Sequence, residues 1–388
     1  MSENTDQEKQ EEVIEELIGL ARKTGSSEVD DLAYGVGYED LKARVEETLG
    51  SWEMGLARAL TLTAPSWRPT PKVRPNEVVE RRVSGAFELP IYVETEDGRF
   101  YTLHGPDLEK NSKGTYLDEE VPIKALHFIG ETDTIALFTT SGQYFGLDQR
   151  MIPLWDRRHG GRSIRDVLFF AGGESVAAAV TRRAMATGRV IHITSQGKGK
   201  ATDAAEFGSG IDRSGLEAFL LKDDDTLVTV VAGSTENTLF CASAQGQGIH
   251  FETEELRSMG RKAVGVNLMK LNDEDDAIIG AFLGRNVRQV AAITAEGIGK
   301  RVDFSEFRTQ GRAGQGMQLL RLNPGDRVAA VAPCNPGDDL AIVTTKGRVF
   351  RIPTTDFPMM GRPAKGNPIV ELQEDEKIRS LTALPCSG

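Results

Sequence analysis

Lysine and arginine residues recur beside glycines in many short loops of this sequence. A cation in such a loop can bind a phosphate, because glycine allows close backbone approach and the side chain supplies the charge. Lys198 and Lys200 are two residues apart, so in a strand they point to one face. The simpler alternative is that these cations only keep exposed strands soluble. The candidates for phosphate contacts are Lys113, Arg157, Arg158, Arg162, Lys198, Lys200, Lys300, Arg301, Arg308, Arg312, Lys346, Arg348, Arg351, Arg362 and Lys365.

One motif containing Gly-Arg occurs three times at a nearly constant interval. In each copy the arginine stands four residues before a second glycine, and an apolar tail follows. These arginines have two interpretations of equal weight: they contact phosphates, or they pin one repeat to the next through carboxylates such as Glu255 or Asp356. The copies are "MGRKAVGVNLMKL" (259–271), "QGRAGQGMQLLRL" (310–322) and "MGRPAKGNPIVEL" (360–372).

Other kinds of chemistry find little support in the residue spacing. The three cysteines and five histidines are dispersed, which argues against a disulfide framework and a metal site. The acidic runs "KDDDT" (222–226) and "NDEDDA" (272–277) lack the spacing of a calcium loop and are interpreted as solvated turns. "GKGK" lacks the context of a phosphate loop, and no catalytic triad can be assembled. We therefore expect no catalytic residue, no metal and no cofactor.

The formal charge of −12 is unevenly distributed. Residues 1–50 hold fourteen acids and five bases, so −9 of the total lies there and −3 over the other 338 residues. Basic patches can therefore exist in the body of the protein. The first ten residues do not resemble a secretory leader, and no apolar run approaches about eighteen residues. We expect a cytoplasmic protein without a membrane partner.

Six hairpin patterns follow one another from about residue 87. Each has two apolar runs separated by a turn glycine, and these glycines are spaced 44, 55, 49, 51 and 50 residues apart. A second glycine follows each one after 16 to 19 residues. An acidic residue stands ten positions further on in the last four repeats, where we expect another turn: Asp225, Asp275, Asp326 and Glu376. Repeats of this length and pattern predict an all-β, propeller-like array.

The N-terminal region has a helical sequence pattern in place of the hairpin pattern. Residues 7–23 and about 39–62 predict helices, and a proline-rich stretch then forms a stiff linker. We expect an acidic helical segment at 1–80 and the β domain at 85–388. The acidic helices could dock a partner, compete with DNA for a basic surface, or pack on the β domain.

The repeats resemble blades of the C-terminal domain of DNA gyrase A and of its topoisomerase IV counterpart. The resemblance covers about residues 87–385 and is strongest in "SAQGQGIHFETEELRSMGRKAVGVNLMKL", "TAEGIGKRVDFSEFRTQGRAGQGMQLLRL" and "TTKGRVFRIPTTDFPMMGRPAKGNPIVEL". It implies a six-bladed β-pinwheel whose blades exchange strands and whose basic outer rim bends or wraps duplex DNA.

The sequence departs from that family in two places. The first 80 residues have no room for the cleavage core with its active-site tyrosine, so this chain alone should not cleave DNA. The family's Q-R-R-G-G-K-G heptapeptide corresponds to "EKNSKGT" (109–115), while a closer likeness, "RRHGGRS" (157–163), stands in the second repeat. Tight wrapping is therefore not expected.

The resemblance implies a free-standing module that binds and bends duplex DNA through sequence-independent backbone contacts. The expected partners are double-stranded DNA and a type II topoisomerase core or another protein that contacts the N-terminal helices. The rival hypothesis is a protein-interaction propeller that has lost DNA wrapping, which the overall acidity and the altered heptapeptide favour.

Overall fold

The computed structural model describes residues 90–104, 108–118, 121–128, 134–154, 162–168, 174–186, 188–208, 212–222, 224–234 and 237–385. The helices expected at 7–23 and 39–62 lie outside these ranges. The β domain belongs to a compact unit, Val83–Gly388. In these ranges, no helix has the length and apolar character needed to cross a membrane.

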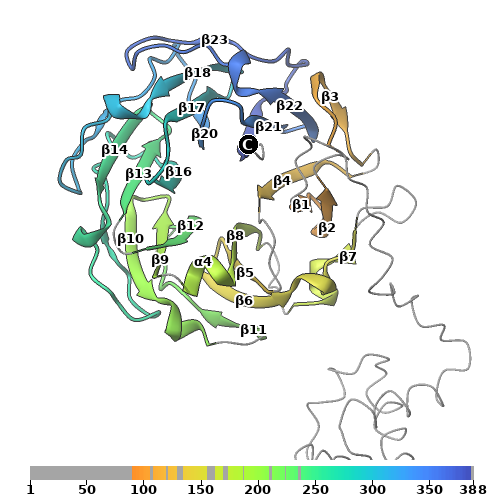
Figure 1. Cartoon of the computed structure of the whole chain (residues 1–388), viewed down its shortest axis with the longest axis vertical. Helices are drawn as coiled ribbons and strands as arrows, with labels where there is room; N and C mark the ends of the chain where they lie inside the picture. The colour runs from red at the N-terminus through yellow and green to blue at the C-terminus, as the bar shows by residue number, and fades with distance from the viewer. Residues whose placement is uncertain are drawn as a thin grey trace, which may run out of the picture. The chain divides into compact units, whose positions relative to one another are not determined.

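Six four-stranded antiparallel sheets surround a central channel as the blades of a propeller (Figure 1). This confirms the all-β, six-bladed prediction. Most strands have six or seven residues and a glycine turn between the two middle strands of the blade. The described ranges hold one α-helix, α4 (Arg182–Ala186), which follows the innermost strand of blade 2.

From the channel outward, the strands of blade 1 are β4 (Ile123–Phe128), β1 (Pro90–Thr95), β2 (Arg99–His104) and β7 (Arg162–Ser163). Those of blade 2, in the same order, are β8 (Val176–Thr181), β5 (Thr134–Thr139), β6 (Gln143–Asp148) and β11 (Asp212–Glu217). Blades 3 and 4 contain β12 (Leu227–Gly233), β9 (Arg189–Thr194), β10 (Lys198–Asp203) and β15 (Val266–Asn267), then β16 (Ile278–Leu283), β13 (Thr238–Ser243), β14 (Gln247–Glu252) and β19 (Met317–Gln318). Blades 5 and 6 contain β20 (Val328–Cys334), β17 (Gln289–Thr294), β18 (Ile298–Asp303) and β23 (Asn367–Pro368), then β24 (Ile378–Leu384), β21 (Asp339–Thr344), β22 (Arg348–Pro353) and β3 (Asn111–Tyr116).

The outermost strand of every blade comes from another repeat. In blade 4, for example, Met317 of the fifth repeat pairs with Gly248 of β14. Each repeat therefore crosses to the preceding blade after its hairpin, often through a short 3-10 helix. These helices are η3 (Gln149–Met151), η5 (Ala204–Phe207), η6 (Thr253–Glu255), η7 (Phe304–Glu306) and η8 (Thr354–Asp356), whereas η4 (Ile164–Asp166) directly follows the exchanged strand β7.

Strand β3 closes the ring. It leaves the first repeat and pairs antiparallel with β22 of the sixth, where Thr115 lies opposite Val349 and Tyr116 opposite Arg348. The sequence left open whether the disc is closed or spiral. The pairing across more than 230 residues shows a closed ring, with β3 and β22 side by side in Figure 1.

The hydrophobic core is divided among the seams between blades. Six clusters of buried apolar side chains lie there, one for each pair of neighbouring blades. The cluster at the closing seam joins Ile91 and Leu103 of blade 1 to Ala341 and Val349 of blade 6, with Leu108 from the crossing segment. A single sheet buries neither face alone, so each blade depends on both neighbours.

The acidic residues of the outer turns cap the hairpins. Asp225 and Asp326 accept hydrogen bonds from the backbone N–H of Gln196 and Glu296 in the adjacent hairpin turns, at 3.0 and 3.3 Å. In the fourth repeat Asp275 lies in the expected turn, but the following residue, Asp276, makes this contact. The turn of the fourth repeat is one residue longer than that of the fifth, so the ten-residue spacing from the second glycine pointed to Asp275 instead of Asp276.

The second glycine of the repeats permits the strand exchange. Gly316 has φ +76°, and a Cβ built on it would lie 2.6 Å from the carbonyl oxygen of Gly248. Gly265 and Gly366 also have positive φ, +81° and +90°, and a Cβ on either would lie within 2.6 Å of a glycine carbonyl oxygen in the preceding blade. A side chain there would both strain the backbone and separate the exchanged strand.

We predict that Gly316→Ala lowers the free energy of unfolding by about 2 kcal/mol or more. The matched control is Gly311→Ala in the same loop, where an added Cβ meets no atom within 4 Å and which should change stability by less than about 0.5 kcal/mol. Urea denaturation of the full chain measures both. Equal losses in the two variants would contradict the role assigned to Gly316.

Candidate nucleic-acid interface

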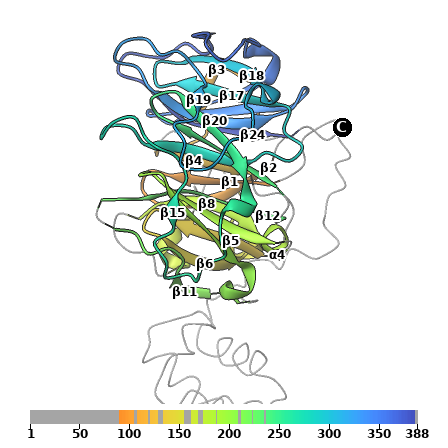
Figure 2. The same cartoon turned by 90° about the vertical axis from the view of Figure 1, so that its left-hand side faces the viewer.

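Three crossing loops follow one another along the rim of blades 3, 4 and 5. The backbone N–H of Ala313 donates to the carbonyl of Leu268 at 2.7 Å, and that of Arg321 donates to the carbonyl of Ala364 at 3.3 Å. The loops contain the outermost strands, of which β15 and β19 lie on the rim facing the viewer in Figure 2. We call this continuous band the belt and define it as residues 257–271, 308–322 and 358–372.

The recurrent arginines fasten the belt to the blades beneath it. Each donates its backbone N–H to a glutamate in the 3-10 helix of the preceding repeat. The pairs are Arg261 with Glu206 at 3.1 Å, Arg312 with Glu255 at 2.9 Å, and Arg362 with Glu306 at 3.2 Å. The guanidinium groups also have partners, since that of Arg312 donates to the carbonyl of Asn267 and that of Arg362 lies 3.8 Å from Glu306. The glutamates hold the loops through the backbone N–H groups, and of the three guanidinium groups that of Arg362 has a carboxylate within 4 Å, as the pinning interpretation expects.

Two of the candidate cations are buried beneath the belt. The ammonium of Lys300 donates to the carbonyls of Gly361 and Arg362 at 2.7 and 2.6 Å. Lys200 makes the equivalent contacts one seam earlier, with the carbonyls of Gly260 and Arg261. Burial lowers the pKa of each lysine to about 8. Because both side chains are buried, we leave them out of the phosphate-facing set.

Two further candidates, Arg348 and Arg351, are buried at the closing seam. Arg348 pairs with Glu376 and donates to the carbonyl of Lys113 at 2.9 Å. Arg351 lies 3.0 Å from Asp339 and donates to the carbonyl of Leu108 at 2.7 Å. Both arginines thus connect blade 6 to the crossing segment of the first repeat. They too are left out of the phosphate-facing set.

The remaining candidates differ in exposure. Lys113, Arg308, Lys346 and Lys365 are exposed, although Lys346 donates to a carbonyl in an acidic turn. Three others are partly buried and hydrogen-bonded or pinned: Lys198, Arg301 and Arg312. Arg362 is partly buried as well. Arg157 and Arg158 lie outside the described residues, and only the backbone of Arg162 is described, in β7.

The structure adds exposed cations that the sequence interpretation missed. Arg257, Lys262, Lys270 and Arg321 all lie on the belt and are exposed. Lys270 and Arg321 occupy the same position in consecutive loops, each directly after a pair of buried apolar residues. Aligning the tails "NLMKL" and "QLLRL" could have found this pair.

The belt is strongly basic. Its three segments hold four, three and two basic residues in chain order, and Glu371 is their only acid. By contrast, the turns beside it carry carboxylates, including the consecutive acids at 273–276. The candidate interface is therefore a basic band on the rim next to an acidic edge.

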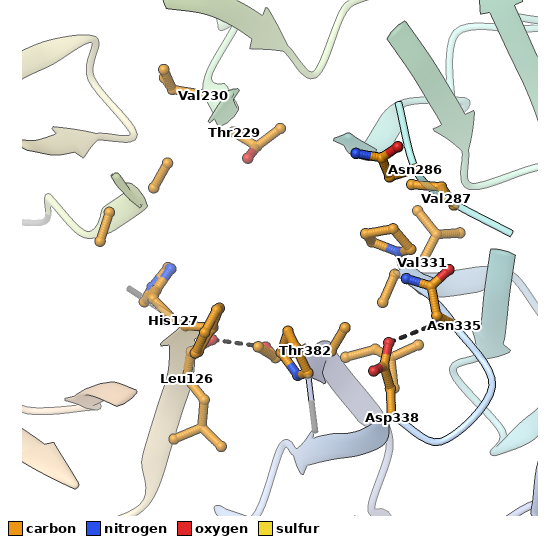
Figure 3. A pocket seen from close by; sticks show the side chains of 18 of the residues that line it. Leu126, His127, Thr229, Val230, Asn286, Val287, Val331, Asn335, Asp338 and Thr382 are labelled. Atoms are coloured by element: carbon orange, nitrogen blue, oxygen red, sulfur yellow. Dashed lines mark hydrogen bonds between the residues drawn. The ribbon is translucent and has the colours of Figure 1, made fainter. Parts of the chain in front are cut away.

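The central channel offers no comparable concentration of charge among the described residues. The innermost strands line it, and Figure 3 shows His127, Thr229, Asn335, Asp338 and Thr382 around it. Polar groups here serve the fold, since Thr382 donates to the carbonyl of Leu126 at 2.8 Å and Asp338 accepts from the N–H of Asn335 at 2.8 Å. Across the part of the chain that the structure describes, no three His, Cys, Asp or Glu side chains are placed to hold a metal.

A ring of blades that exchange their outermost strands is a β-pinwheel, a class of propeller-like folds. The family model described as DNA gyrase C-terminal domain, beta-propeller, matches residues 190–233, 237–284, 288–335 and 338–385. The propeller of this chain belongs to the DNA gyrase A C-terminal domain family, as the resemblance predicted.

Curated relatives agree with this assignment. The DNA gyrase A protein of Aminobacterium colombiense is 29% identical over 76% of this chain and 36% of its own length. The Salmonella typhimurium gyrase A protein is 30% identical over 70% of this chain and 31% of its own length. The chain thus spans about a third of these relatives.

Solved structures show the same fold. The DNA gyrase A C-terminal domain aligns with a TM-score of 0.67 and 17% identity, over 77% of this chain and all of that domain. The C-terminal domain of DNA topoisomerase IV aligns with a TM-score of 0.62 and 22% identity, over 76% of this chain and 93% of that domain.

We predict that Lys300→Met lowers the free energy of unfolding by about 2 kcal/mol, because the backbone carbonyls of Gly361 and Arg362 lose the buried donor that they share. Lys365→Met removes an exposed lysine from the loop above and should cost less than about 0.5 kcal/mol. Urea denaturation checks both variants. A loss at Lys365 as large as that at Lys300 would contradict the assignment of Lys300 to the seam.

The closing seam should also be sensitive to acid. Burial alone would raise the pKa of Glu376, but hydrogen bonds from Arg348, the backbone of Gln373 and Thr344 lower it to about 2. A carboxylate whose pKa is lower in the folded state contributes stability above its unfolded pKa, and this is lost as the pH falls.

We therefore expect wild type to be more stable than Glu376→Gln by about 2 kcal/mol at pH 6 and the difference to shrink between pH 4.5 and 2. Urea denaturation at a series of pH values measures it, with the exposed Glu374→Gln as control. A difference that stays constant down to pH 2 would show that the Arg348 pair does not hold the seam.

Proposed function

We propose that the belt binds duplex DNA through its phosphate backbone and bends the DNA along the rim. The observation that carries this proposal is the continuous basic band across three consecutive blades of a chain whose formal charge is −12. Exposed lysines and arginines suit phosphate contacts, which need no base reading. Membership of the gyrase A C-terminal domain family adds support.

The shape of the interface favours bending over flat binding. The belt follows the outer edge of a ring, so a duplex that contacts successive loops must curve with it. The acidic turns beside the belt repel phosphates and confine the duplex to the band. Pinned loops and buried lysines hold the cations on a fixed support, so little backbone ordering accompanies binding.

The DNA-binding surface should cover only part of the rim. At the closing seam Arg348 and Arg351 are engaged with carboxylates and backbone carbonyls. Two exposed lysines remain in "EKNSKGT", of which Lys110 lies 3.2 Å from Asp339 and Lys113 is a candidate for phosphate contact. We propose that the chain bends DNA over blades 3 to 5 without tight wrapping and modulates DNA topology with a type II topoisomerase core. In this proposal the chain performs no catalytic step, and it acts at the nucleoid in the cytoplasm.

Duplex affinity and its salt dependence should be set by the exposed charges of the belt. Lys270→Gln with Arg321→Gln removes two proposed phosphate contacts, so duplex affinity should fall and the slope of log affinity against log salt should flatten by about 2. Lys222→Gln with Lys377→Gln removes two exposed lysines from the acidic turns and should leave the slope unchanged. Fluorescence anisotropy with one duplex at several salt concentrations measures both.

Equal slopes in the two double variants would contradict the belt as the DNA surface. Absence of binding at low salt by the unmodified chain would remove the DNA function altogether and leave the rival hypothesis of a protein-interaction propeller. That rival finds some support in the four candidate cations that serve the seams.

A further inference from the structure

A backbone carbonyl at one position of the crossing segment receives an arginine in three of the seams. Arg189 donates to the carbonyl of Leu256 at 2.8 Å. Arg301 donates to Phe357 at 2.7 Å, and Arg351 to Leu108 at 2.7 Å. Leu256 and Phe357 each follow the 3-10 helix of their repeat directly. A guanidinium group is therefore a recurrent partner of this carbonyl, found in three of the six seams.

In blades 5 and 6 the guanidinium also reaches the first residue of the second strand. Arg301 donates to Gln289 at 2.8 Å, and Arg351 lies 3.0 Å from Asp339. Gln289 begins β17 and Asp339 begins β21. The arginine thus bridges the carbonyl of the crossing segment and a side chain at the start of its own blade.

Blade 4 has a histidine where blades 5 and 6 have these arginines. His250 stands four residues after its turn glycine, as Arg301 and Arg351 do after theirs. Its Nδ1 lies 2.8 Å from the carbonyl oxygen of Phe307. Because a carbonyl only accepts, Nδ1 carries a proton, and in the tautomer that holds this single proton Nε2 is an acceptor.

The Nε2 atom of His250 has no hydrogen-bond partner among the described residues, and the residue is 8% exposed. A buried acceptor without a donor is unfavourable and marks a place where a ligand donor would bind. The imidazole lies against Phe304, with ring centroids 4.6 Å apart. Its orientation is therefore fixed from two sides.

A recess of about 540 Å³ opens beside this imidazole. His250, Thr238 and Phe304 line it together with Asn237, Glu252 and Glu254. Thr238 begins β13, so it occupies the position of Gln289 and Asp339. The recess thus lies where the arginines of blades 5 and 6 place their guanidinium groups, and it adds two exposed carboxylates.

We propose that this recess is a binding site for a guanidinium group, carried by a small molecule or by an arginine side chain of a peptide. One N–H of the ligand donates to Nε2 of His250, and others face the Thr238 hydroxyl and the carboxylates of Glu252 and Glu254. Phe304 provides an aromatic wall suited to a planar cation. The residues that line this site lie outside the belt, and ligand binding there does not depend on DNA binding.

Arg285 is the residue that could compete with the ligand. It also lines the recess, and its backbone N–H donates to the side chain of Asn237 at 2.9 Å. Its positive charge weakens attraction for a cation, and its own guanidinium is long enough to enter. The experiment therefore includes a variant without this side chain.

The test titrates the full chain with agmatine at constant ionic strength and follows the Thr238 amide by ¹H–¹⁵N NMR. Putrescine, which replaces the guanidinium by a second ammonium, is the matched control ligand. We expect a saturable shift with agmatine and at least a tenfold weaker response with putrescine. A Gly-Arg-Gly peptide with blocked ends forms the second arm, and tighter binding of the peptide than of agmatine would identify an arginine side chain as the ligand.

The matched variant is His250→Arg, which gives blade 4 the arginine of blades 5 and 6. It should abolish the agmatine shift and raise the midpoint of thermal unfolding, whereas Glu252→Gln with Glu254→Gln should weaken binding severalfold. The proposal is wrong if His250→Arg binds agmatine as wild type does, if wild type shows no saturable shift, or if agmatine binds only after Arg285→Ala.

Discussion

The exchange of strands between neighbouring repeats is the constraint on which this structure depends. A blade receives its outermost strand from another repeat, and the crossing segment brings backbone carbonyls that must find donors in the blade that it covers. Glycines allow the close approach, and buried lysines, arginines and one histidine supply the donors. Because β3 crosses from the first repeat to the last blade, the same arrangement closes the ring.

This constraint divides the basic residues into two groups. Lys200, Lys300, Arg348 and Arg351 are buried, and their charges stabilise the seams. The exposed cations of the belt lie on loops that the hydrogen bonds of Lys200 and Lys300 hold in place. The proposed function therefore depends on the seams indirectly: they fix the curvature and position of a surface whose charge is available to a partner. A weakened seam would move the belt without removing any of its charge.

The sequence predicted the architecture well because the repeat period and the turn glycines are local signals. Six hairpins and two glycines per repeat were enough for the six-bladed ring. The burial of Lys200 could not be predicted from such local signals. Strand alternation places Lys200 on one face with Lys198. The crossing loop of the next repeat, about 60 residues later, covers Lys200 and leaves Lys198 partly exposed. The pairing of β3 with β22 has no local signal either, since its partners are more than 230 residues apart.

Membership of the gyrase A C-terminal domain family makes DNA the natural partner to test, and the belt specifies where on the ring it should bind. Hydrogen exchange measured by mass spectrometry, on the full chain with and without duplex DNA at low salt, tests this most directly. The account predicts slower exchange in residues 257–271, 308–322 and 358–372 and no change in the acidic turn at 272–277. Protection of that turn, or of the channel strands instead of the belt, would contradict it.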